Sequence, residues 1–471
     1  MTGSGRRGVL AIVLHTHMPY VEGFGTWPFG EEWLWEAIAV SYLPLLDVLE
    51  RDVPLTLSLT PVLCDQLAAE GIAERFLVFM RDVRRESHRV DIAGLGAAGE
   101  LQLAGELERA AEDYERAIER FRARDGDLLG ALAPFAQWTS SATHAVLPLL
   151  ATDAGVRSQL QAGIDAHRAR FGAWNGGFWL PECAHDPWLD PLLAEAGVRH
   201  TCLDLTDVLG LGALEQLRPL RGAGGPVLMP IDRQTVELVW SPHGYPAHGT
   251  YRDYHHHTVH HHRPWGNDGA PYDHRAARAQ AREHARDFVG RSIARLASGS
   301  EALGRPAIAV CAIDTELLGH WWYEGIWWLE AVLEEAGERG LELRRLDDVL
   351  EGCAPAPVPP DAGVTSWGSP RDLSTWDGPA VADLAFDARA AELQLLAAGP
   401  GADRRRLREL LALQSSDWAF MVTRRLAGPY PRERAAGHRR AFETGDGSIG
   451  SSGPRIRNLA AHAKVSPLLA P

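Results

Sequence analysis

Short apolar runs that alternate with helical patterns constrain the fold of this sequence more than any other feature. The runs are too short for helices and rich in β-branched residues, which predicts buried strands. They lie at 8–14, 54–60, 176–180, 200–205, 226–231, 235–240, 307–313 and 341–346. Helical patterns separate many of them, at 62–80, about 95–125, 188–197, 272–298 and 326–338. Strands alternating with helices predict an α/β fold with a mainly parallel sheet covered on both faces.

Polar residues follow several of these runs directly. His15 and His17 follow the first run, and Glu182, Asp232 and Asp314 follow later ones. In a parallel barrel the carboxyl ends of the strands meet on one face, where the active site forms. We therefore expect these side chains to converge.

The chain changes character after residue 353. The stretch 354–380 is rich in proline, glycine and serine, which predicts a linker or a long crossing loop. From residue 381 onward, Ala, Leu, Arg and Glu recur at helical spacing. This predicts an α-helical C-terminal domain.

Composition excludes several classes of partner. The net charge is −15 and no block of Lys and Arg interrupts it, so nucleic acid and anionic membranes are repelled. No apolar stretch reaches the ~20 residues that span a bilayer. The five cysteines are odd in number and widely scattered, which favours reduced thiols in a cytoplasmic protein.

The chain contains sixteen tryptophans, many of them beside glycine, proline or a charge. Core packing accounts for several tryptophans in any protein of this size. A flat ring with one N–H at a turn also suits the lining of a ligand cleft. The apolar faces of sugar rings are natural partners for such surfaces.

Glu182 and Asp314 each end an apolar strand. Two carboxylates at strand ends can face each other across a cleft, and a retaining glycosidase needs such a pair about 5–5.5 Å apart. The alternatives are an ordinary salt bridge or a helix N-cap. Glu316 competes with Asp314, because a residue two positions on points to the same side of an extended segment.

His15 and His17 share one face of their strand, so they can bind a metal or hydrogen-bond a substrate. A metal site needs more ligands, for which His144, His185 and His320 are available. A polar or structural role is the more common one for such a pair, and we expect no metal.

Two other features are weaker. Cys183 and His185 lack the paired spacing of a closed zinc site. The run "YHHHTVHHHRPW" at 254–265 predicts an exposed loop that binds metals adventitiously, and the role of 255–262 stays open. No glycine-rich nucleotide-binding motif is present.

Five segments together resemble the ordered sequence regions of glycoside hydrolase family 57. They are "LHTHMPYV", "SSATHAVLPLL", "GFWLPECAH", "AIDTELLGHWWYEG" and "LQSSDWAFMVT". The resemblance is closest to the α-1,4-glucan branching enzymes, which the segments "GTWPFGEEWLWEA" and "TSWGSPRDLSTW" also resemble. The matches run from about residue 10 to 442, nearly the whole chain.

This resemblance implies a distorted, incomplete (β/α)7 TIM-like barrel over 1–353, with a helical insertion at about 85–130. The segment 354–380 would line the cleft, and 381–471 would form the helical domain. The implied activity is retaining transfer of an α-1,4-glucan chain to a 6-hydroxyl, without cofactor or metal. The implied substrate is an α-glucan such as amylose, glycogen or a modified glucan; the oligomeric state stays open.

The resemblance also assigns roles to residues. Glu182 would be the nucleophile and Asp314 the general acid/base. The remaining residues would bind substrate, and they are His15, His17, His144, Trp27, Trp33, Trp240, Trp367, Trp376, Asp417 and Trp418.

One departure bears on the activity. Branching enzymes of this family usually carry a longer loop between the nucleophile strand and the "VWS" segment, with a tyrosine thought to shield the site from water. Here the interval from Glu182 to Trp240 is short, and "LRGAGGPVL" contains no tyrosine. Hydrolysis would then compete, or another loop, such as the His-rich one, would provide the shield.

Three alternatives remain open. The first is an α-glucan hydrolase or 4-α-glucanotransferase on the same scaffold. The second is a non-catalytic glucan-binding protein. The third is a metal-dependent polysaccharide deacetylase-like enzyme, suggested by His15 and His17.

Overall fold

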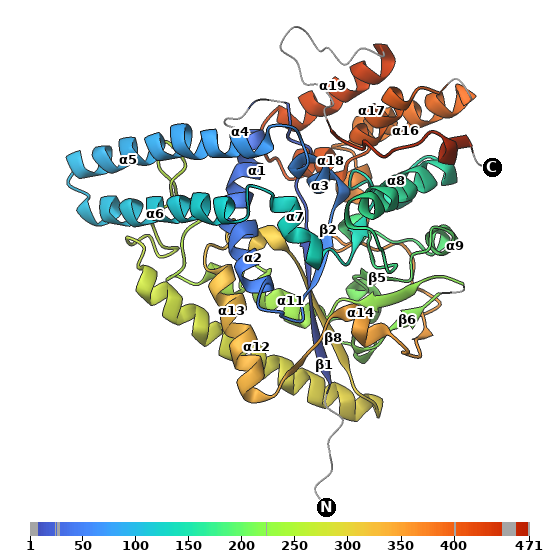
Figure 1. Cartoon of the computed structure of the whole chain (residues 1–471). Coiled ribbons are helices and arrows are strands. Elements are labelled where there is room, and N and C mark those ends of the chain that lie inside the picture. The colour runs from blue at the N-terminus through green and yellow to red at the C-terminus, as the bar shows by residue number, and fades with distance from the viewer. Residues whose placement is uncertain are drawn as a thin grey trace, which may run out of the picture.

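The computed structural model describes most of the chain. The described residues are 8–23, 25, 29–222, 224–399, 402–444 and 458–469. Figure 1 shows strands at the centre, long helices around them and a group of helices above one end.

Seven parallel strands of the described chain form a distorted barrel. They are β1 (Val9–Thr16), β2 (Thr56–Leu59), β3 (Thr139–Ser140), β4 (Phe178–Trp179), β5 (His200–Leu203), β7 (Val227–Pro230) and β8 (Ile308–Asp314). β8, β1 and β2 pair continuously, as do β3 with β4 and β5 with β7. Single bridges join β2 to β3 and β4 to β5. One hydrogen bond, from Asp232 N to Val310 O at 2.9 Å, links β7 back to β8. The structure thus confirms the predicted (β/α)7 fold.

Three further strands lie beside the barrel. β9 (Glu342–Leu343) extends the sheet from β1, and β6 (Leu220–Arg221) pairs antiparallel with β7. β10 (Ala356–Pro357) adds to β6. All eight residues of β1 are buried, as expected for a strand with both faces covered.

One predicted strand, at 235–240, is wrong. The segment belongs to α11 (Arg233–Val239), in which Val236 and Val239 are buried at helical spacing. A segment of six residues with four apolar side chains fits a helix as well as a strand, so its periodicity could not separate the two. Conversely, β3 is a strand that was not predicted, because two residues are too few to show a strand pattern.

Helices surround the barrel. Near the start of the chain are α1 (Glu31–Ala37), a π-helix at Ile38–Tyr42 and α2 (Leu43–Leu49). The predicted helix at 62–80 is split into α3 (Pro61–Leu67) and α4 (Ile72–Val78). Ala68 caps the C-terminal end of α3, and Gly71, whose φ of 71° is left-handed, directly precedes α4.

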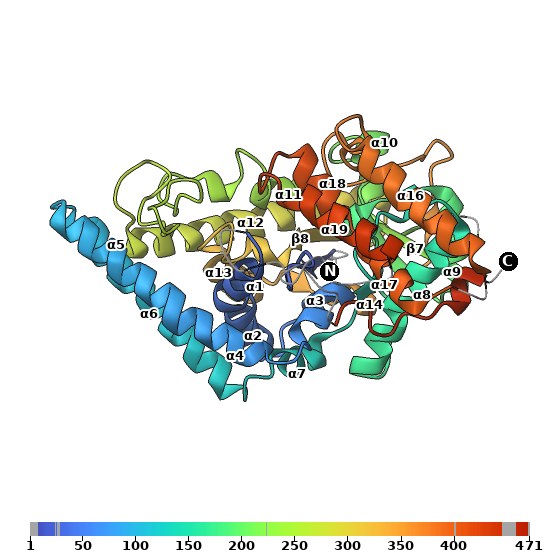
Figure 2. The same ribbon diagram turned by 90° about the horizontal axis from the view of Figure 1, so that it is seen from above.

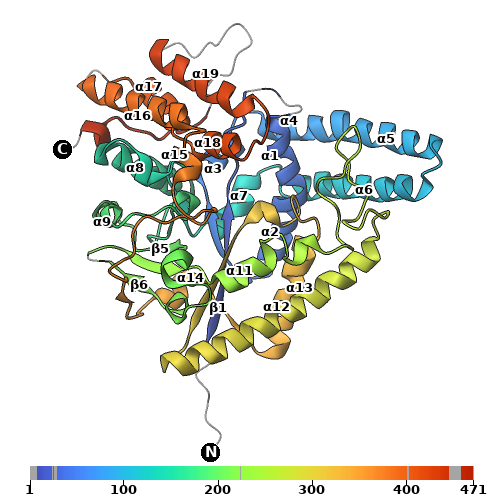
Figure 3. The same ribbon diagram turned by 180° about the vertical axis from the view of Figure 1, so that it is seen from behind.

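The later barrel helices are α7 (Leu128–Leu132), α8 (Asp153–Phe171), α9 (Asp190–Glu195), α10 (Thr206–Leu209), α12 (His274–Leu303), α13 (Gly325–Arg339) and α14 (Leu346–Leu350). α12 and α13 lie side by side on the outside of the barrel (Figures 1 and 3).

A helical hairpin projects from the barrel within the predicted insertion. Its arms are α5 (Arg85–Ala97) and α6 (Leu101–Ala123), and Figure 2 shows them extending to one side. The His-rich loop before α12 lies along α5 (Figure 2), where Thr258 and His260 hydrogen-bond to Asp91.

The C-terminal helices pack over the end of the barrel at which β1 and β8 finish. They are α15 (Ser374–Asp377), α16 (Ala382–Ala397), α17 (Arg404–Leu413), α18 (Ser416–Thr423) and α19 (Tyr430–Thr444). Their apolar core includes Tyr20 and Val62 of the barrel, so the two parts share a buried surface. Figure 3 shows α15 and α18 above the central strands.

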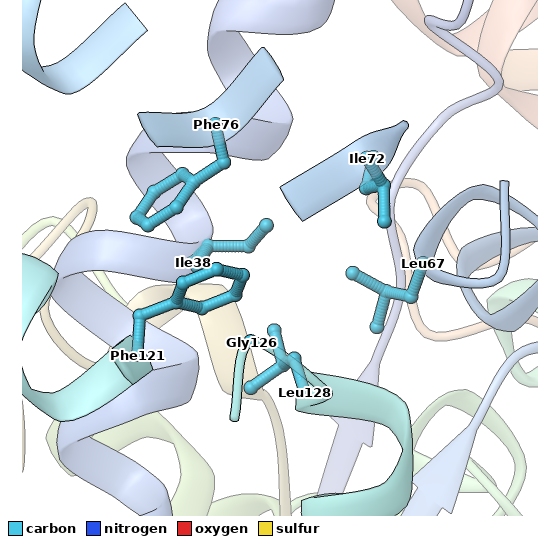
Figure 4. Close-up of a pocket in the computed structure, with 7 residues that line it drawn as sticks. All are labelled: Ile38, Leu67, Ile72, Phe76, Phe121, Gly126 and Leu128. Carbon is cyan, nitrogen blue, oxygen red and sulfur yellow. The ribbon is translucent and has the colours of Figure 1, made fainter. Parts of the chain in front are cut away.

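An apolar pocket lies where α3, α4 and α6 meet the π-helix (Figure 4). Its lining is Ile38, Leu67, Ile72, Phe76, Phe121, Gly126 and Leu128. A pocket without a polar side chain offers no group for chemistry. None of the described helices is both long and apolar enough to cross a bilayer.

Candidate active site

Glu182 lies just beyond β4, in a single 3-10 turn formed by Pro181–Cys183. Its backbone is left-handed, at φ 59° and ψ 19°, which is rare for a residue with a side chain. Such a conformation costs roughly 1–3 kcal/mol and persists only where surrounding contacts enforce it. Here the Cys183 N–H donates to Leu180 O at 2.8 Å, and the Trp367 N–H donates to Glu182 O at 3.0 Å.

Two donors hold the Glu182 carboxylate. The Trp367 indole N–H donates to Oε2 at 3.2 Å, and the Ser416 hydroxyl donates to Oε1 at 3.0 Å. The side chain is 14% exposed. Burial raises the pKa of Glu182 to about 7, the Asp417 carboxylate adds to the rise, and the two hydrogen bonds oppose it.

Asp314 is the last residue of β8 and lies in register with His15 of β1. Among the described residues no hydrogen bond reaches its carboxyl group. Burial, with the negative charges of Glu316 and Glu182, raises the pKa of Asp314 well above its usual value. Glu182 and Asp314 therefore differ: two donors stabilise the anion of Glu182, whereas burial without a donor favours the protonated form of Asp314.

Glu316, the competitor of Asp314, is already engaged. It accepts the Tyr42 hydroxyl at 2.6 Å and the His17 backbone N–H at 3.2 Å. Burial raises its pKa to about 7, and the Tyr42 hydrogen bond opposes the rise. The carboxylate of Glu316 thus holds Tyr42 and the backbone of His17 in place, whereas the Asp314 carboxyl is free to contact a ligand.

Three predicted histidines cluster around Glu182. His15 Nε2 lies 3.0 Å from His144 Nε2, and the rings of His17 and His144 stack at 3.9 Å. Burial lowers the pKa of His15 and of His144 well below the usual value, and their histidine neighbours lower both further. Although burial opposes it, the Asp417 carboxylate, 3.0 Å from His17 Nε2, raises the pKa of His17.

Two of the predicted tryptophans are packed in the interior. Trp376 is 3% exposed and belongs to an apolar cluster with Val146 and Val381. Trp418 is 1% exposed and donates its N–H to Ala412 O at 2.8 Å. Neither ring offers a face to a sugar, which disagrees with the role predicted for both residues.

The other predicted tryptophans differ in their surroundings. Trp33 is half-buried against Phe29 and Tyr430. Trp240 is 38% exposed and lies 5.4 Å from Trp321, which is 39% exposed. Trp27 lies outside the described residues.

The exposed pair Trp240 and Trp321 lies near the carboxyl ends of β7 and β8. Trp240 directly follows α11, and the Trp321 N–H donates to Glu316 O at 3.2 Å. Both rings therefore belong to the face of the barrel that carries Asp314.

The segment 354–380 crosses over the Glu182 turn. Thr365 and His185 exchange two backbone hydrogen bonds of 2.9 Å, and Trp367 follows two residues after Thr365.

Cys183 and His185 are not partners of Glu182 in a metal site. Cys183 is fully buried, and His185 bonds Asp190 at 2.9 Å. No group of three or more potential metal ligands occurs among the described residues.

Several residues of the site were not predicted from the sequence. Ser416 stands in the "LQSSDWAF" segment quoted above, where a serine pair before an aspartate was the available signal. Trp179, whose ring stacks on His15 at 4.5 Å, reads as an ordinary strand residue. Tyr42 had no distinguishing pattern, and Trp321 lies in the segment "AIDTELLGHWWYEG" but was assigned no role.

Comparisons with known proteins agree with this geometry. The family model described as glycosyl hydrolase family 57 matches residues 138–356, and that of the C-terminal domain of 1,4-alpha-glucan branching enzymes matches 402–468. A probable 1,4-alpha-glucan branching enzyme of Mycobacterium tuberculosis is 34% identical over 92% of this chain and 91% of its own.

Two proteins of known structure are also similar. The 1,4-alpha-glucan branching enzyme of Thermococcus kodakarensis is 31% identical over 93% of this chain and 73% of its own. Its crystal structure superposes with a TM-score of 0.88, covering 98% of this chain and 96% of that one. An α-amylase of Thermotoga maritima has a TM-score of 0.78 at 25% identity, covering 93% and 92%. The chain belongs to glycosyl hydrolase family 57.

Proposed function

We propose that this protein is a 1,4-α-glucan branching enzyme, with Glu182 as nucleophile and Asp314 as general acid/base. The observation that carries the proposal is the contrast between the two carboxyl groups. Two donors hold the Glu182 carboxylate, whereas no hydrogen bond among the described residues reaches the Asp314 carboxyl, whose pKa burial raises well above its usual value. Pairs of carboxyl groups whose environments separate their pKa values mark the acid and the base of a site.

The proposed reaction has two steps. Glu182 attacks the anomeric carbon of an α-1,4-glucan while Asp314 protonates the departing chain, which gives a covalent glucosyl–enzyme intermediate. Asp314 then takes the proton of a 6-hydroxyl on a second glucan, whose oxygen attacks the same carbon and releases Glu182. The product is an α-1,6 branch with retained configuration, and the steps require no cofactor.

The glucan has polar and apolar partners in this scheme. His15, His17 and His144 lie beside Glu182 and would bind hydroxyl groups of the cleaved sugar. Trp240 and Trp321 would bind sugar rings farther along the chain. Glycogen or a related α-glucan is the proposed physiological substrate.

Hydrolysis is the second candidate activity. The interval from Glu182 to Trp240 is short and carries no tyrosine near "LRGAGGPVL". Similarity to an α-amylase over 93% of the chain also favours this candidate. We assign the shielding of the intermediate to the His-rich loop, whose Tyr254 lies 5.8 Å from His320, next to Trp321.

Incubation with amylose, followed by proton NMR, tests the proposal. New α-1,6 anomeric signals without a matching rise in reducing ends mean branching. Reducing ends alone mean hydrolysis, and new α-1,4 chain lengths alone mean 4-α-glucanotransfer. Glucan binding without turnover, unaffected by substitution of Glu182, would overturn an enzymatic role.

A cytoplasmic location is part of the proposal. All five cysteines are free thiols and four are buried, as is usual for proteins kept in reducing surroundings. Fractionation of the native host, with immunoblotting, tests this location.

A further inference from the structure

A chain of hydrogen bonds ends on the Glu182 carboxylate. Ser58 Oγ lies 3.3 Å from His15 Nδ1, and His15 Nε2 lies 3.0 Å from His144 Nε2. His144 Nδ1 lies 2.8 Å from Ser416 Oγ, which lies 3.0 Å from Glu182 Oε1. A single hydrogen bond joins each member to the next, so the direction of one hydrogen bond determines the direction of all the others.

The direction of this chain follows from Glu182. An ionised carboxylate only accepts, so the single hydroxyl proton of Ser416 points to Glu182. Ser416 Oγ must then accept from His144 Nδ1–H, which leaves the Nε2 of neutral His144 as an acceptor. His15 therefore donates from Nε2 and accepts the Ser58 hydroxyl at Nδ1. Every proton in the chain points towards Glu182.

Backbone contacts and burial fix the position of Ser416. It is the first residue of α18, and its backbone N–H donates to His144 O at 3.1 Å. It is buried, and it comes from the C-terminal helices rather than from a barrel strand. A bridge between Ala145 and Ser415 secures the same junction.

We propose that Ser416 is a positioning residue for the nucleophile: its hydroxyl holds Glu182 as the attacking anion and sets the tautomer of His144. This inference rests on the proposed function. By donating to Glu182 Oε1, Ser416 fixes the carboxylate rotamer before attack. In the second step the same donor stabilises Glu182 as it leaves the anomeric carbon.

Other charged groups also face Glu182. Asp417 approaches from α18, Asp314 from β8, and His17 from the segment after β1. His144 Nδ1 lies 3.7 Å from Oε1. Removing the Ser416 hydroxyl leaves Asp417, Asp314 and His17 in place and takes away two hydrogen bonds, the one to Glu182 and the one from His144. The resulting change in pH dependence therefore reports the loss of this link between His144 and Glu182.

The test is Ser416→Ala, measured for kcat, KM and the pH profile of kcat/KM on amylose. A hydrogen bond to a charged group is worth ~1.5–3 kcal/mol, so we expect kcat to fall about 10- to 100-fold with KM little changed. We also expect the acidic limb of the profile to move to higher pH. Ser416→Thr keeps the hydroxyl and should recover most of the activity and the original limb.

One control variant and one independent measurement make the result specific. Ser292→Ala removes a buried hydroxyl from α12 that has no hydrogen-bond partner among the described residues, and should change neither kcat nor the pH profile. In the unsubstituted enzyme, ¹⁵N NMR of the ring nitrogens should show His144 protonated at Nδ1. The signal is assigned by its loss in His144→Gln.

The proposal is overturned if Ser416→Ala keeps kcat within twofold with an unmoved acidic limb, or if His144 is protonated at Nε2. The NMR result decides the question if Ser416→Ala fails to fold. Glu182→Gln is measured in parallel. An active Glu182→Gln refutes the proposed function, whereas an inactive Glu182→Gln beside an unaffected Ser416→Ala refutes this inference alone.

Discussion

The indole N–H of Trp367 lies 3.2 Å from Glu182 Oε2, although 185 residues separate the two positions. The Trp367 backbone N–H also donates to the Glu182 carbonyl. The crossing segment therefore holds both the backbone and the side chain of the proposed nucleophile. Trp367, predicted to bind substrate, is thus also a hydrogen-bond donor to Glu182.

Glu182→Gln and Asp314→Asn should each lower kcat at least about 1000-fold, equal to roughly 4 kcal/mol of barrier. Small nucleophiles distinguish the two roles. With an activated α-glucosyl substrate, azide should rescue Asp314→Ala to a product of retained configuration and Glu182→Ala to an inverted one. The exchange of these outcomes would reverse the assignment. Glu74→Gln, on the exposed face of α4, is the control.

The acidic limb of kcat/KM should lie near pH 7, because Glu182 must ionise before it attacks and its pKa is raised to about 7. Activity falls again at higher pH, as Asp314 loses the proton needed by the leaving group. Trp367→Phe keeps a ring but removes a donor to the anion, so it should move the acidic limb to higher pH. An acidic limb below pH 5 would contradict this account.

Trp240→Ala and Trp321→Ala should each raise KM for long glucans, by about 3- to 10-fold if each ring contributes roughly 1 kcal/mol. The effect on kcat should be smaller, because neither ring touches Glu182 or Asp314. The double variant should be nearly additive if the rings contact different sugars. Phe386→Ala, an exposed aromatic on α16, is the matched control.

Tyr254→Ala should raise the ratio of hydrolysis to branching several-fold, because the His-rich loop would shield the intermediate less well from water. The ratio is measured from reducing ends and α-1,6 signals in one incubation. His257→Ala changes an exposed residue of the same loop and should leave the ratio unchanged. A ratio that does not change in Tyr254→Ala would remove this loop from the mechanism.

Glu32→Gln should stabilise the protein more as pH rises. Burial raises the pKa of Glu32 to about 8, and Glu36 adds to the rise. A raised folded-state pKa means that stability is lost as pH increases from the unfolded value towards 8. The variant should melt near the wild type at pH 5 and several degrees higher at pH 9. An equal difference in melting temperature between variant and wild type at pH 5 and pH 9 would refute this prediction. Glu74→Gln again serves as the control.

Much of the fold was readable because buried parallel strands leave continuous apolar runs. Glu182 and Asp314 were readable for the same reason, since a carboxylate directly after such a run is conspicuous. The error at 235–240 has the opposite cause: a segment of six residues, four of them apolar, satisfies a helix as well as a strand. Trp376 and Trp418 show a further limit, because neighbouring turns do not reveal whether a ring faces solvent or core.

The sequence by itself determined the alternation of strands and helices and the carboxylates at the strand ends. Both are properties of short segments, in which each residue's burial follows from its neighbours. Only the tertiary structure decided how those carboxylates are held. The left-handed turn at Glu182, the N–H of Trp367 and the hydroxyl of Ser416 meet through packing between the barrel, the crossing segment and α18. Such contacts join positions 185 and 234 residues apart, and no local pattern records them.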